Sequence, residues 1–467
     1  MSRPRTDKLP FPVKFFYGGA EFANSMTFTL FYTFGIFFFT DVARLSPAFA
    51  GLMIMAGTLF DAVLDPIIGI VSDRWRTRWG RRRPFILAMA FPFGLVSWLL
   101  FTDFNLSPIW SHVYFFVIVL LFFLCYALLT VPYYALAAEM TQDYNERTSL
   151  VSYQAGWSQV ASIIAGGAPL VLADYFARNW NSVKAGWCTV GAILGAACVP
   201  LILLTWHFTR GYELSPENTR ITFKDVYQAA FKNRPFFYTM GLYTFGMIGM
   251  SVASGFGMYF MKYYMEMDHE QSSLAFTILF GCTIVWIPFI SLISNKWGKP
   301  WAYMVSMGLW ASGQGIGILV LRPGMTVLLY LVMVLASGGF VAISLLGWSM
   351  LPDVVEVDEF KTGQRREGLY QGIFAFVQKA SCAPILGLNG LILERIGYLP
   401  DVPQSKDTIL GIRLIFSWDV TGFILIGMVF CILLPMTKKK HELLRQAIAL
   451  KKQGKEYDLQ SIEDLVR

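Results

Sequence analysis

Residues 46–73 read SPAFAGLMIMAGTLFDAVLDPIIGIVSD, an apolar stretch with few polar side chains. A helix needs about 20 mainly apolar residues to cross the hydrocarbon core of a bilayer, and this stretch is longer. Stretches of the same kind recur along the whole chain. The predicted spans are 11–39, 46–73, 84–103, 111–140, 149–174, 186–208, 236–265, 270–294, 300–321, 325–352, 368–394 and 410–435. The sequence therefore predicts an all-α membrane protein with twelve transmembrane helices.

The composition agrees with this prediction. Of the 467 residues, 55% are hydrophobic and only 15% are charged, and the mean hydropathy is +0.51. A soluble protein carries about 25% charged residues. These values exclude a soluble enzyme, a disordered chain and a nucleic-acid-binding domain as leading interpretations. The apolar stretch after residues 1–10 is too long for a cleaved signal peptide, so we expect it to be retained as the first span.

The basic residues predict the orientation. Most of the 38 lysine and arginine residues fall in the loops and termini on one side of the predicted spans. Short loops rich in lysine and arginine stay in the cytoplasm, so both termini are expected there. The net charge of +7 is then a topology signal, and no nucleic-acid partner is expected. The absence of a long outer loop favours a bacterial inner (plasma) membrane.

Two loops repeat one another at corresponding places in the chain. Spans two and three are joined by Trp79-Gly80-Arg81-Arg82-Arg83-Pro84, and spans eight and nine by Trp297-Gly298-Lys299-Pro300. The longer polar segment 209–235 separates the two copies. We therefore predict two six-helix bundles with a duplicated architecture, as in secondary transporters of the major facilitator type. The predicted parts are an N-terminal bundle (1–208), a cytoplasmic central loop (209–235), a C-terminal bundle (236–435) and a cytoplasmic tail (436–467).

A few ionisable side chains lie inside the predicted spans: Glu21, Asp61, Asp65, Lys262 and Lys379. At a rise of 1.5 Å per residue, Asp61 lies roughly 18 Å, Lys379 roughly 16 Å and Glu21 roughly 15 Å from a predicted helix end. Charges on three helices therefore converge near the middle of a core about 30 Å thick. Lys262 lies near the outer end of its span, where it can reach the membrane surface, and it is assigned no role.

Asp61 and Asp65 are four residues apart and so lie on one face of a helix. Two carboxylates that close repel each other, and a proton, a sodium ion or a cationic side chain relieves the repulsion. Lys379 is the internal cation that could pair with them when no ion is bound. We therefore predict a switchable cation site, and a static salt-bridged network between helices is the alternative. Pro66 also frees a backbone carbonyl that could face an ion.

Glu21 is a candidate substrate-binding acid, because a carboxylate beside a cavity accepts hydrogen bonds from substrate hydroxyls. Thr130 and Tyr134 on the fourth span lie at a comparable depth, roughly 15 Å from the inner end for Thr130. An aromatic face beside an acid suits a sugar ring. The alternative is that Glu21 only pairs with a neighbouring polar helix and that Tyr134 only packs.

Four parts of the sequence together resemble the glycoside–pentoside–hexuronide:cation symporters, a family of the major facilitator superfamily that includes the melibiose permeases. They are the segment Phe60-Asp61-Ala62-Val63-Leu64-Asp65-Pro66, the Arg78–Pro84 loop, Val131-Pro132-Tyr133-Tyr134, and the region from Asp353 to Lys379. The resemblance covers nearly the whole chain and implies cation-coupled symport of a sugar or glycoside. It matches the family's cation-site aspartates to Asp61 and Asp65, its coupling lysine to Lys379 and a sugar-binding acid to Glu21.

The resemblance is incomplete in the sugar site. Where the melibiose type has a second sugar-binding acid this chain has Thr130, and where it has a tryptophan this chain has Tyr134. The family's arginine at the start of span five falls near Gln154 or Ala155, and its tenth-span tryptophan falls on Ser344. A substrate other than a galactoside is therefore expected, with Glu21, Thr130, Tyr134 and Gln154 as the candidate binding residues.

The resemblance is also incomplete in the cation site. Leu64 and Ala127 replace polar residues of the family pattern. These changes favour protons, although the paired acids keep Na+ at Asp61 and Asp65 open. Animal relatives in the same family carry lysophospholipids, so an amphiphile carrier is the alternative within the family. No cofactor is expected beyond the coupling ion, and the protein is expected to act as a monomer in the lipid bilayer.

Charged residues near the cytoplasmic ends of the spans are candidates for a cytoplasmic gate that locks the outward-facing state. They are Asp73, Arg74, Glu139, Arg147, Asp353 and Arg366. The alternative is that the arginines only determine topology. A membrane-embedded enzyme is disfavoured because the chain has no HExxH, GxSxG or metal-ligand cluster. A channel would leave the duplicated halves and the buried Asp-Asp-Lys set unexplained.

Overall fold

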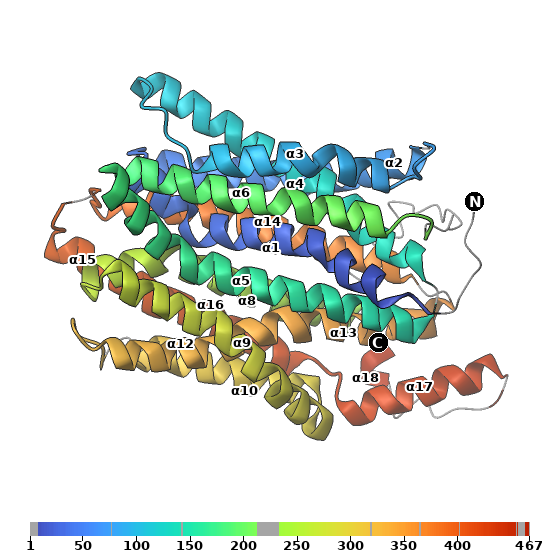
Figure 1. Ribbon diagram of the computed structural model, residues 1–467. Coiled ribbons are helices and arrows are strands. Elements are labelled where there is room, and N and C mark those ends of the chain that lie inside the picture. The colour runs from blue at the N-terminus through green and yellow to red at the C-terminus, as the bar shows by residue number, and fades with distance from the viewer. Residues whose placement is uncertain are drawn as a thin grey trace.

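The computed structural model describes residues 8–75, 77–141, 143–212, 233–317, 320–363, 366–400, 402–453, 455 and 463–466. Helices run side by side along the long axis of the molecule, as Figure 1 shows. The first half of the chain forms α1 (Phe11–Phe37), continued by the π-helix η1 (Phe38–Val42), then α2 (Pro47–Arg74), α3 (Arg83–Leu100), α4 (Pro108–Met140), α5 (Tyr144–Trp180) and α6 (Val183–Phe208).

The second half repeats this pattern with more interruptions. It contains α8 (Arg234–Tyr259) with the π-helix η2 (Phe260–Tyr264), α9 (His269–Trp297), α10 (Lys299–Ser312) with η3 (Gly313–Gly317), α12 (Thr326–Val341), η4 (Ala342–Leu346), α13 (Gly347–Thr362), α14 (Glu367–Arg395), α15 (Lys406–Leu414), η5 (Ile415–Asp419) and α16 (Val420–Leu433). Two helices of the tail follow, α17 (Lys438–Lys452) and α18 (Glu463–Val466). The prediction of an all-α membrane protein is confirmed.

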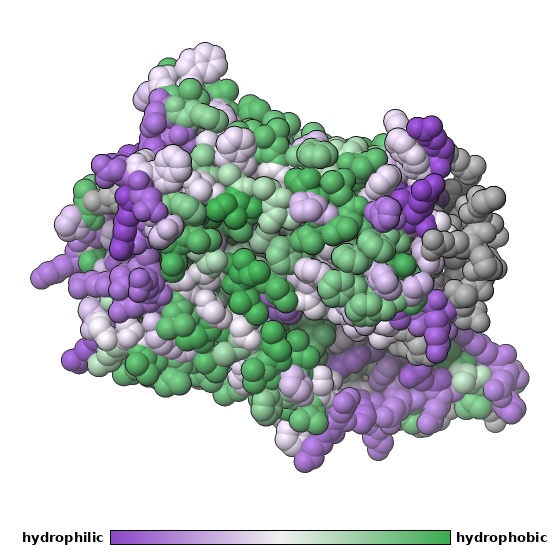
Figure 2. All heavy atoms as spheres, viewed as in Figure 1, coloured by the Kyte–Doolittle hydropathy of each residue, from purple (hydrophilic) through white to green (hydrophobic). Residues whose placement is uncertain are grey.

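Within the described residues, 11 helices are long and apolar enough to cross a membrane. Apolar side chains cover the middle of the molecule and polar ones gather at its two ends, as Figure 2 shows. The ninth predicted span, 300–321, corresponds to α10 and η3. Helix α10 alone has only 14 residues, and residues 318–319 lie outside the described part of the chain.

Polar residues set where many of the helices begin. The side chains of Ser46, Asp143, Asn233 and Asp268 accept hydrogen bonds from backbone N–H groups of the first turns of α2, α5, α8 and α9. The first turn of a helix leaves backbone donors without partners, and these caps satisfy them. The long apolar helices therefore start at defined positions, which fixes the depth of the charged residues that they carry.

The helices of each half pack mainly on one another: α1 with α5 and α6, and α3 with α6 in the first half, α8 with α16 and α9 with α12 in the second. The halves meet where α2 packs on α14, α5 on α9 and α1 on α8. The predicted central loop, 209–235, falls between them, and its residues 213–232 lie outside the described residues.

The contact between α2 and α14 depends on glycine. A Cβ atom on Gly51 would lie 2.8 Å from Cα of Gly390, and a Cβ atom on Gly390 would lie 2.1 Å from the carbonyl oxygen of Pro47. Real Cβ atoms do not approach backbone so closely, so both positions require glycine. The two backbones can therefore touch, which holds the polar residues of α2 against those of α14.

The two ends of the molecule are distinct. The end that we call the basic end holds the start of α1, the loop from α2 to α3 and helix α17, while η1, η2 and α15 lie at the opposite end (Figure 1). The repeated loops lie at the basic end, and their glycines adopt the same rare backbone conformation, with φ of 100° at Gly80 and 97° at Gly298. A side chain is strained in this conformation, which explains why both copies carry glycine.

Candidate functional site

The two acids of α2 and the lysine of α14 meet at one point. The Nζ atom of Lys379 lies 2.6 Å from Oδ2 of Asp61 and 2.5 Å from Oδ2 of Asp65. The side chain of Asp61 is only 4% exposed, whereas those of Asp65 and Lys379 are about a quarter exposed. The four-residue spacing places both carboxylates on the face of α2 that packs on α14. One ammonium group therefore bridges two carboxylates across the boundary between the halves.

The acid pair keeps unused acceptor capacity. Among the described residues, Oδ1 of Asp61 and Oδ1 of Asp65 have no hydrogen-bond partner. Pro66 follows Asp65 inside α2 and has no N–H, so the carbonyl of Ala62 loses its helical partner. One turn before Asp61, the hydroxyl of Thr58 lies 3.3 Å from that of Tyr32 on α1. This stretch of α2 therefore offers further oxygen atoms close in sequence to a site with two carboxylates and one ammonium group.

A second polar cluster is centred on Glu21 of α1, which is 7% exposed. Its carboxylate accepts hydrogen bonds from Ser25 (3.0 Å), from the amide of Gln154 on α5 (3.0 Å) and from the hydroxyl of Tyr134 on α4 (3.4 Å). Ser25 also lies 2.6 Å from the hydroxyl of Ser158 on α5. Three of the four residues predicted to bind substrate are thus brought into contact.

The surroundings of this cluster add one residue that the sequence analysis did not name. Thr130 lies one turn before Tyr134 on α4 and is buried, whereas Tyr134 is 45% exposed. Asn24, beside the cluster on α1, is 1% exposed, and neither polar atom of its amide has a hydrogen-bond partner among the described residues. A lone asparagine in an apolar span was a usable sequence signal, because a buried amide without a partner is costly.

At the basic end of the first half, the arginine-rich loop contacts the end of α4. Glu139 accepts hydrogen bonds from Arg81 at 2.5 Å and from Arg82 at 3.0 Å. Arg82 also pairs with Asp73 and donates to the hydroxyl of Ser72. The predicted gate residues Asp73 and Glu139 are therefore joined through an arginine that the prediction did not name.

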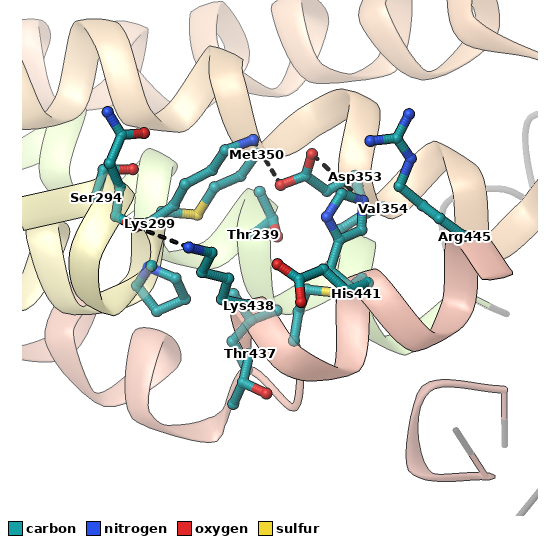
Figure 3. Close-up of a pocket in the computed structure, with 16 residues that line it drawn as sticks. Thr239, Ser294, Lys299, Met350, Asp353, Val354, Thr437, Lys438, His441 and Arg445 are labelled. Atoms are coloured by element: carbon teal, nitrogen blue, oxygen red, sulfur yellow. Dashed lines mark hydrogen bonds and ion pairs between the residues drawn. The ribbon is translucent and has the colours of Figure 1, made fainter. Parts of the chain in front are cut away.

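The second half has the corresponding contact at the same end. Lys299, from the repeated loop, lies 2.6 Å from Asp353 of α13, and both residues line a cavity of about 350 Å³ (Figure 3). His441 of α17 lies on the other side of Asp353, at 3.7 Å, and 2.9 Å from Glu356. The repeated loop of the second half supplies one lysine at this contact, and the tail helix adds His441 as a further neighbour of Asp353. Arg366, another predicted gate residue, pairs with Asp358 at 2.7 Å.

The remaining predicted gate residues, Arg74 and Arg147, are exposed at the basic end. Another contact, which the sequence analysis missed, lies at the end opposite the basic end, where Lys262 of η2 lies 2.7 Å from Asp41 of η1. Lys262 was identified as a charge within a span but assigned no role. The signal was the presence of an acid near the outer end of span one as well as a lysine near the outer end of span seven.

Comparison with known proteins decides the family. Residues 16–438 match the model of the MFS/sugar transport protein family. The chain belongs to this family. An uncharacterised symporter of Synechocystis sp. is 29% identical over 96% of this chain and 98% of its own length. The isoprimeverose transporter of Lactiplantibacillus pentosus is 26% identical over 89% of this chain and 87% of its own length.

Comparison of the folds agrees. A solved structure of a bacterial homologue of the human lysosomal transporter Spinster, in an inward-facing and unoccupied conformation, matches with a TM-score of 0.68 and 13% identity. The match covers 90% of this chain and 96% of that one. The chain therefore has the major facilitator fold, and the resemblance inferred from the sequence motifs is confirmed. The protein is a membrane transporter rather than an enzyme.

Proposed function

We propose that the protein takes up a sugar or glycoside together with a cation by alternating access. The observation that carries this proposal is the contact of Lys379 with both Asp61 and Asp65, whose other oxygens have no partner among the described residues. This arrangement holds one negative charge more than positive. A cation that neutralises an acid frees Lys379, and Lys379 can pair again once the cation has left.

The coupling cation is transported with the substrate, and both candidates fit the oxygens at the site. A proton needs only one carboxylate oxygen. A sodium ion needs several oxygen ligands, for which Asp61, Asp65 and the carbonyl of Ala62 are available on one stretch of α2. We favour a proton, because the neighbouring positions Leu64 and Ala127 offer no side-chain oxygen.

The substrate site that we propose is the cluster around Glu21. Its carboxylate, the amide of Gln154 and the hydroxyls of Ser25 and Tyr134 form a dense group of donors and acceptors on three helices. Hydroxyl groups of a sugar can replace these internal bonds, and the exposed ring of Tyr134 can pack on the C–H face of the sugar. A relative that transports isoprimeverose, 26% identical to this chain, supports a sugar as substrate.

The distribution of charge supports an orientation in the membrane, and with it a direction of transport. We propose that the basic end faces the cytoplasm, because lysine and arginine in short loops are retained there. A membrane of a bacterial cell, with an inward proton gradient, would then drive accumulation of the sugar inside. Lys14, Arg81 and Arg82, all paired with acids at the basic end, lie on this side.

The first experiment measures thermal stability of the purified protein with a panel of neutral and acidic sugars, at several pH values with and without sodium. A sugar that raises the melting temperature is then tested for uptake into proteoliposomes under an imposed proton or sodium gradient. We expect saturable accumulation that follows the proton gradient. Binding of sugars without any response to either gradient would overturn the coupling, and stabilisation only by lipid-like amphiphiles would overturn the sugar.

A further inference from the structure

Asp41 is a buried carboxylate at the end of the first helix, where the α-helix gives way to the π-helix η1. Its side chain is only 2% exposed. It accepts hydrogen bonds from Lys262 at 2.7 Å, from Tyr263 at 2.7 Å and from Tyr398 at 2.6 Å. All three donors belong to the second half of the chain. Asp41 is therefore a point where several residues of one half bind a single residue of the other.

Further contacts close a ring around this carboxylate. The hydroxyl of Thr40 donates to Asp41 at 2.9 Å and lies 2.7 Å from that of Tyr259. The hydroxyls of Tyr263 and Tyr398 lie 3.0 Å apart. The rings of Tyr259 and Tyr398 pack edge to face, 5.0 Å between centroids. Aromatic rings therefore flank these polar atoms, and the carboxylate of Asp41 is almost completely buried where the two halves meet.

The two π-helices that carry Asp41 and its partners Lys262 and Tyr263 occupy matching places in the repeat. In each, the N–H after the last π residue bonds back to the first: Ala43 to Phe38 at 2.9 Å, and Met265 to Phe260 at 3.0 Å. Such segments are rare and occur frequently at functional sites. Each lies at the end of the first helix of its half, opposite the basic end. The contact therefore joins the two halves at the end farthest from the arginine-rich loop.

We propose that Asp41 is the centre of an extracellular gate, in which Lys262, Tyr263 and Tyr398 hold the outer ends of the two halves together. The gate must part before substrate can enter from outside. This proposal rests on the proposed function for its direction, since the end called extracellular is the one opposite the basic end. Asp41 acts as a positioning residue and does not itself contact the sugar or the coupling cation.

The bonding of Asp41 explains why this pair closes a path rather than binding an ion. Both of its oxygens have donors, Lys262 and Tyr263 on one, Thr40 and Tyr398 on the other. No acceptor capacity is left for a cation, and the charges of Asp41 and Lys262 balance. Removing one partner of a buried ion pair leaves an uncompensated charge, which is strongly unfavourable in the closed state. In the open state water solvates both groups, so the gate can part reversibly.

The chain offers a matched control for this gate. Asp103 is also a carboxylate at the end opposite the basic end. Its side chain is 4% exposed and pairs with Lys184 at 2.6 Å. Both Asp103 and Lys184 belong to the first half, so their ion pair does not connect the two halves. Asp41→Asn and Asp103→Asn therefore remove the same charge at the same end, and only Asp41→Asn breaks a contact between the halves.

The test is hydrogen–deuterium exchange of the full-length protein in lipid nanodiscs, read on peptides that cover residues 38–42 and 260–264. Asp41→Asn should raise the exchange rate in both segments by about tenfold, because we expect the population of the open state to rise by the same factor. Asp103→Asn should leave both segments as in the wild type. Equal exchange in wild type and Asp41→Asn would overturn the gate, and so would a rise confined to residues 38–42.

A milder variant keeps the test decisive if Asp41→Asn does not fold. Tyr398→Phe removes one hydrogen bond to Asp41 and should raise exchange in the same two segments by roughly threefold. No rise with Tyr398→Phe would overturn the gate. The measurement needs neither substrate nor gradient. If exchange rises as expected but the protein does not transport, only the proposed function is overturned. If transport is normal but exchange does not rise in the variants, only the gate is overturned.

Discussion

Among the described residues, lysines of the second half pair with carboxylates of the first half at two places, which differ in their balance of charge and in their free acceptors. Near the middle of the helices, Lys379 serves two carboxylates, Asp61 and Asp65, and an oxygen of each has no partner among the described residues. At the end opposite the basic end, Lys262 pairs with one carboxylate, that of Asp41, and both oxygens of this carboxylate are hydrogen-bonded. The first site has an excess negative charge and free acceptors, and the second has neither.

Under the proposed function, similar ion pairs serve two tasks. In the mechanism that we propose, a cation gains from entering the first site because it neutralises the excess charge and finds free oxygens. It gains nothing at the second, where the charges already balance. Buried pairs contribute little net stability against their desolvation, so both can break during transport. We infer that the count of unsatisfied oxygens, and not the presence of a lysine, separates an ion-binding site from a contact that only closes.

The largest expected effect comes from removing the excess charge of the first site. Asp65→Asn leaves Lys379 and Asp61 as a balanced pair, which no longer attracts a cation. We expect uphill accumulation in proteoliposomes to be lost while exchange of substrate without a gradient is partly retained. Asp103→Asn, which changes a pair within the first half, should accumulate substrate as the wild type does. Unimpaired uphill transport by Asp65→Asn would remove the distinction between the two sites.

The next effect tests whether Glu21 forms a third site, which binds substrate rather than a cation. Glu21→Ala removes the acceptor of three hydrogen bonds. A hydrogen bond to a charged group contributes about 1.5–3 kcal/mol, so substrate affinity should fall by roughly 10- to 100-fold in a calorimetric titration. Tyr134→Phe, which loses one long bond to Glu21, is the milder comparison. Unchanged affinity with Glu21→Ala would exclude Glu21 from the substrate site.

A smaller effect is expected from the backbone contact that brings α2 against α14. Gly390→Ala places a methyl group where no space exists, and overpacking of this kind costs about 1–3 kcal/mol. The melting temperature should fall, and so should uphill transport, because Lys379 moves away from Asp61. Gly372→Ala on the same helix adds its methyl group in open space and should leave stability unchanged or slightly raised. Equal melting temperatures for the two variants would contradict the close contact.

The smallest effect should come from an ion pair outside both sites. Lys452 of the tail lies 2.6 Å from Glu359 of α13, and its side chain is 66% exposed. Exposed pairs contribute about 0–1 kcal/mol. Lys452→Gln should therefore change neither accumulation nor melting temperature beyond the scatter of the measurement. A clear loss of transport would show that the tail restrains α13 more strongly than its exposure indicates.

The sequence allowed the fold and the central charges to be predicted, because both follow from local patterns. Spans follow from apolar length, and the meeting of Lys379 with Asp61 and Asp65 follows from depth and helical spacing. Gln154 was predicted through family resemblance, and its contact with Glu21 is found in the structure. The roles of these residues stay predictions until transport is measured.

Other contacts could not be predicted because they depend on helix rotation and on packing between distant segments. Arg81 and Arg82, rather than Arg74, reach Glu139 because of the turn at Gly80, which the composition of the loop does not reveal. Asp41 and Lys262 are 221 residues apart. The position of Lys262 near the end of its span gives an ordinary explanation for its charge, and Asp41 lies just beyond the predicted first span.

The tail helix has a practical consequence for anyone who shortens the protein to obtain crystals or to attach a tag. Asp353, Glu356 and Glu359 lie along one side of α13, and two of the three bind His441 or Lys452 of α17 at close range. A version that stops before Lys438 would remove His441 and Lys452 from that row of acids, while Lys299 could still pair with Asp353. Repulsion among these acids would then destabilise α13. Poor expression of such a version would therefore reflect the loss of their partners on α17 rather than a misfolded transport domain.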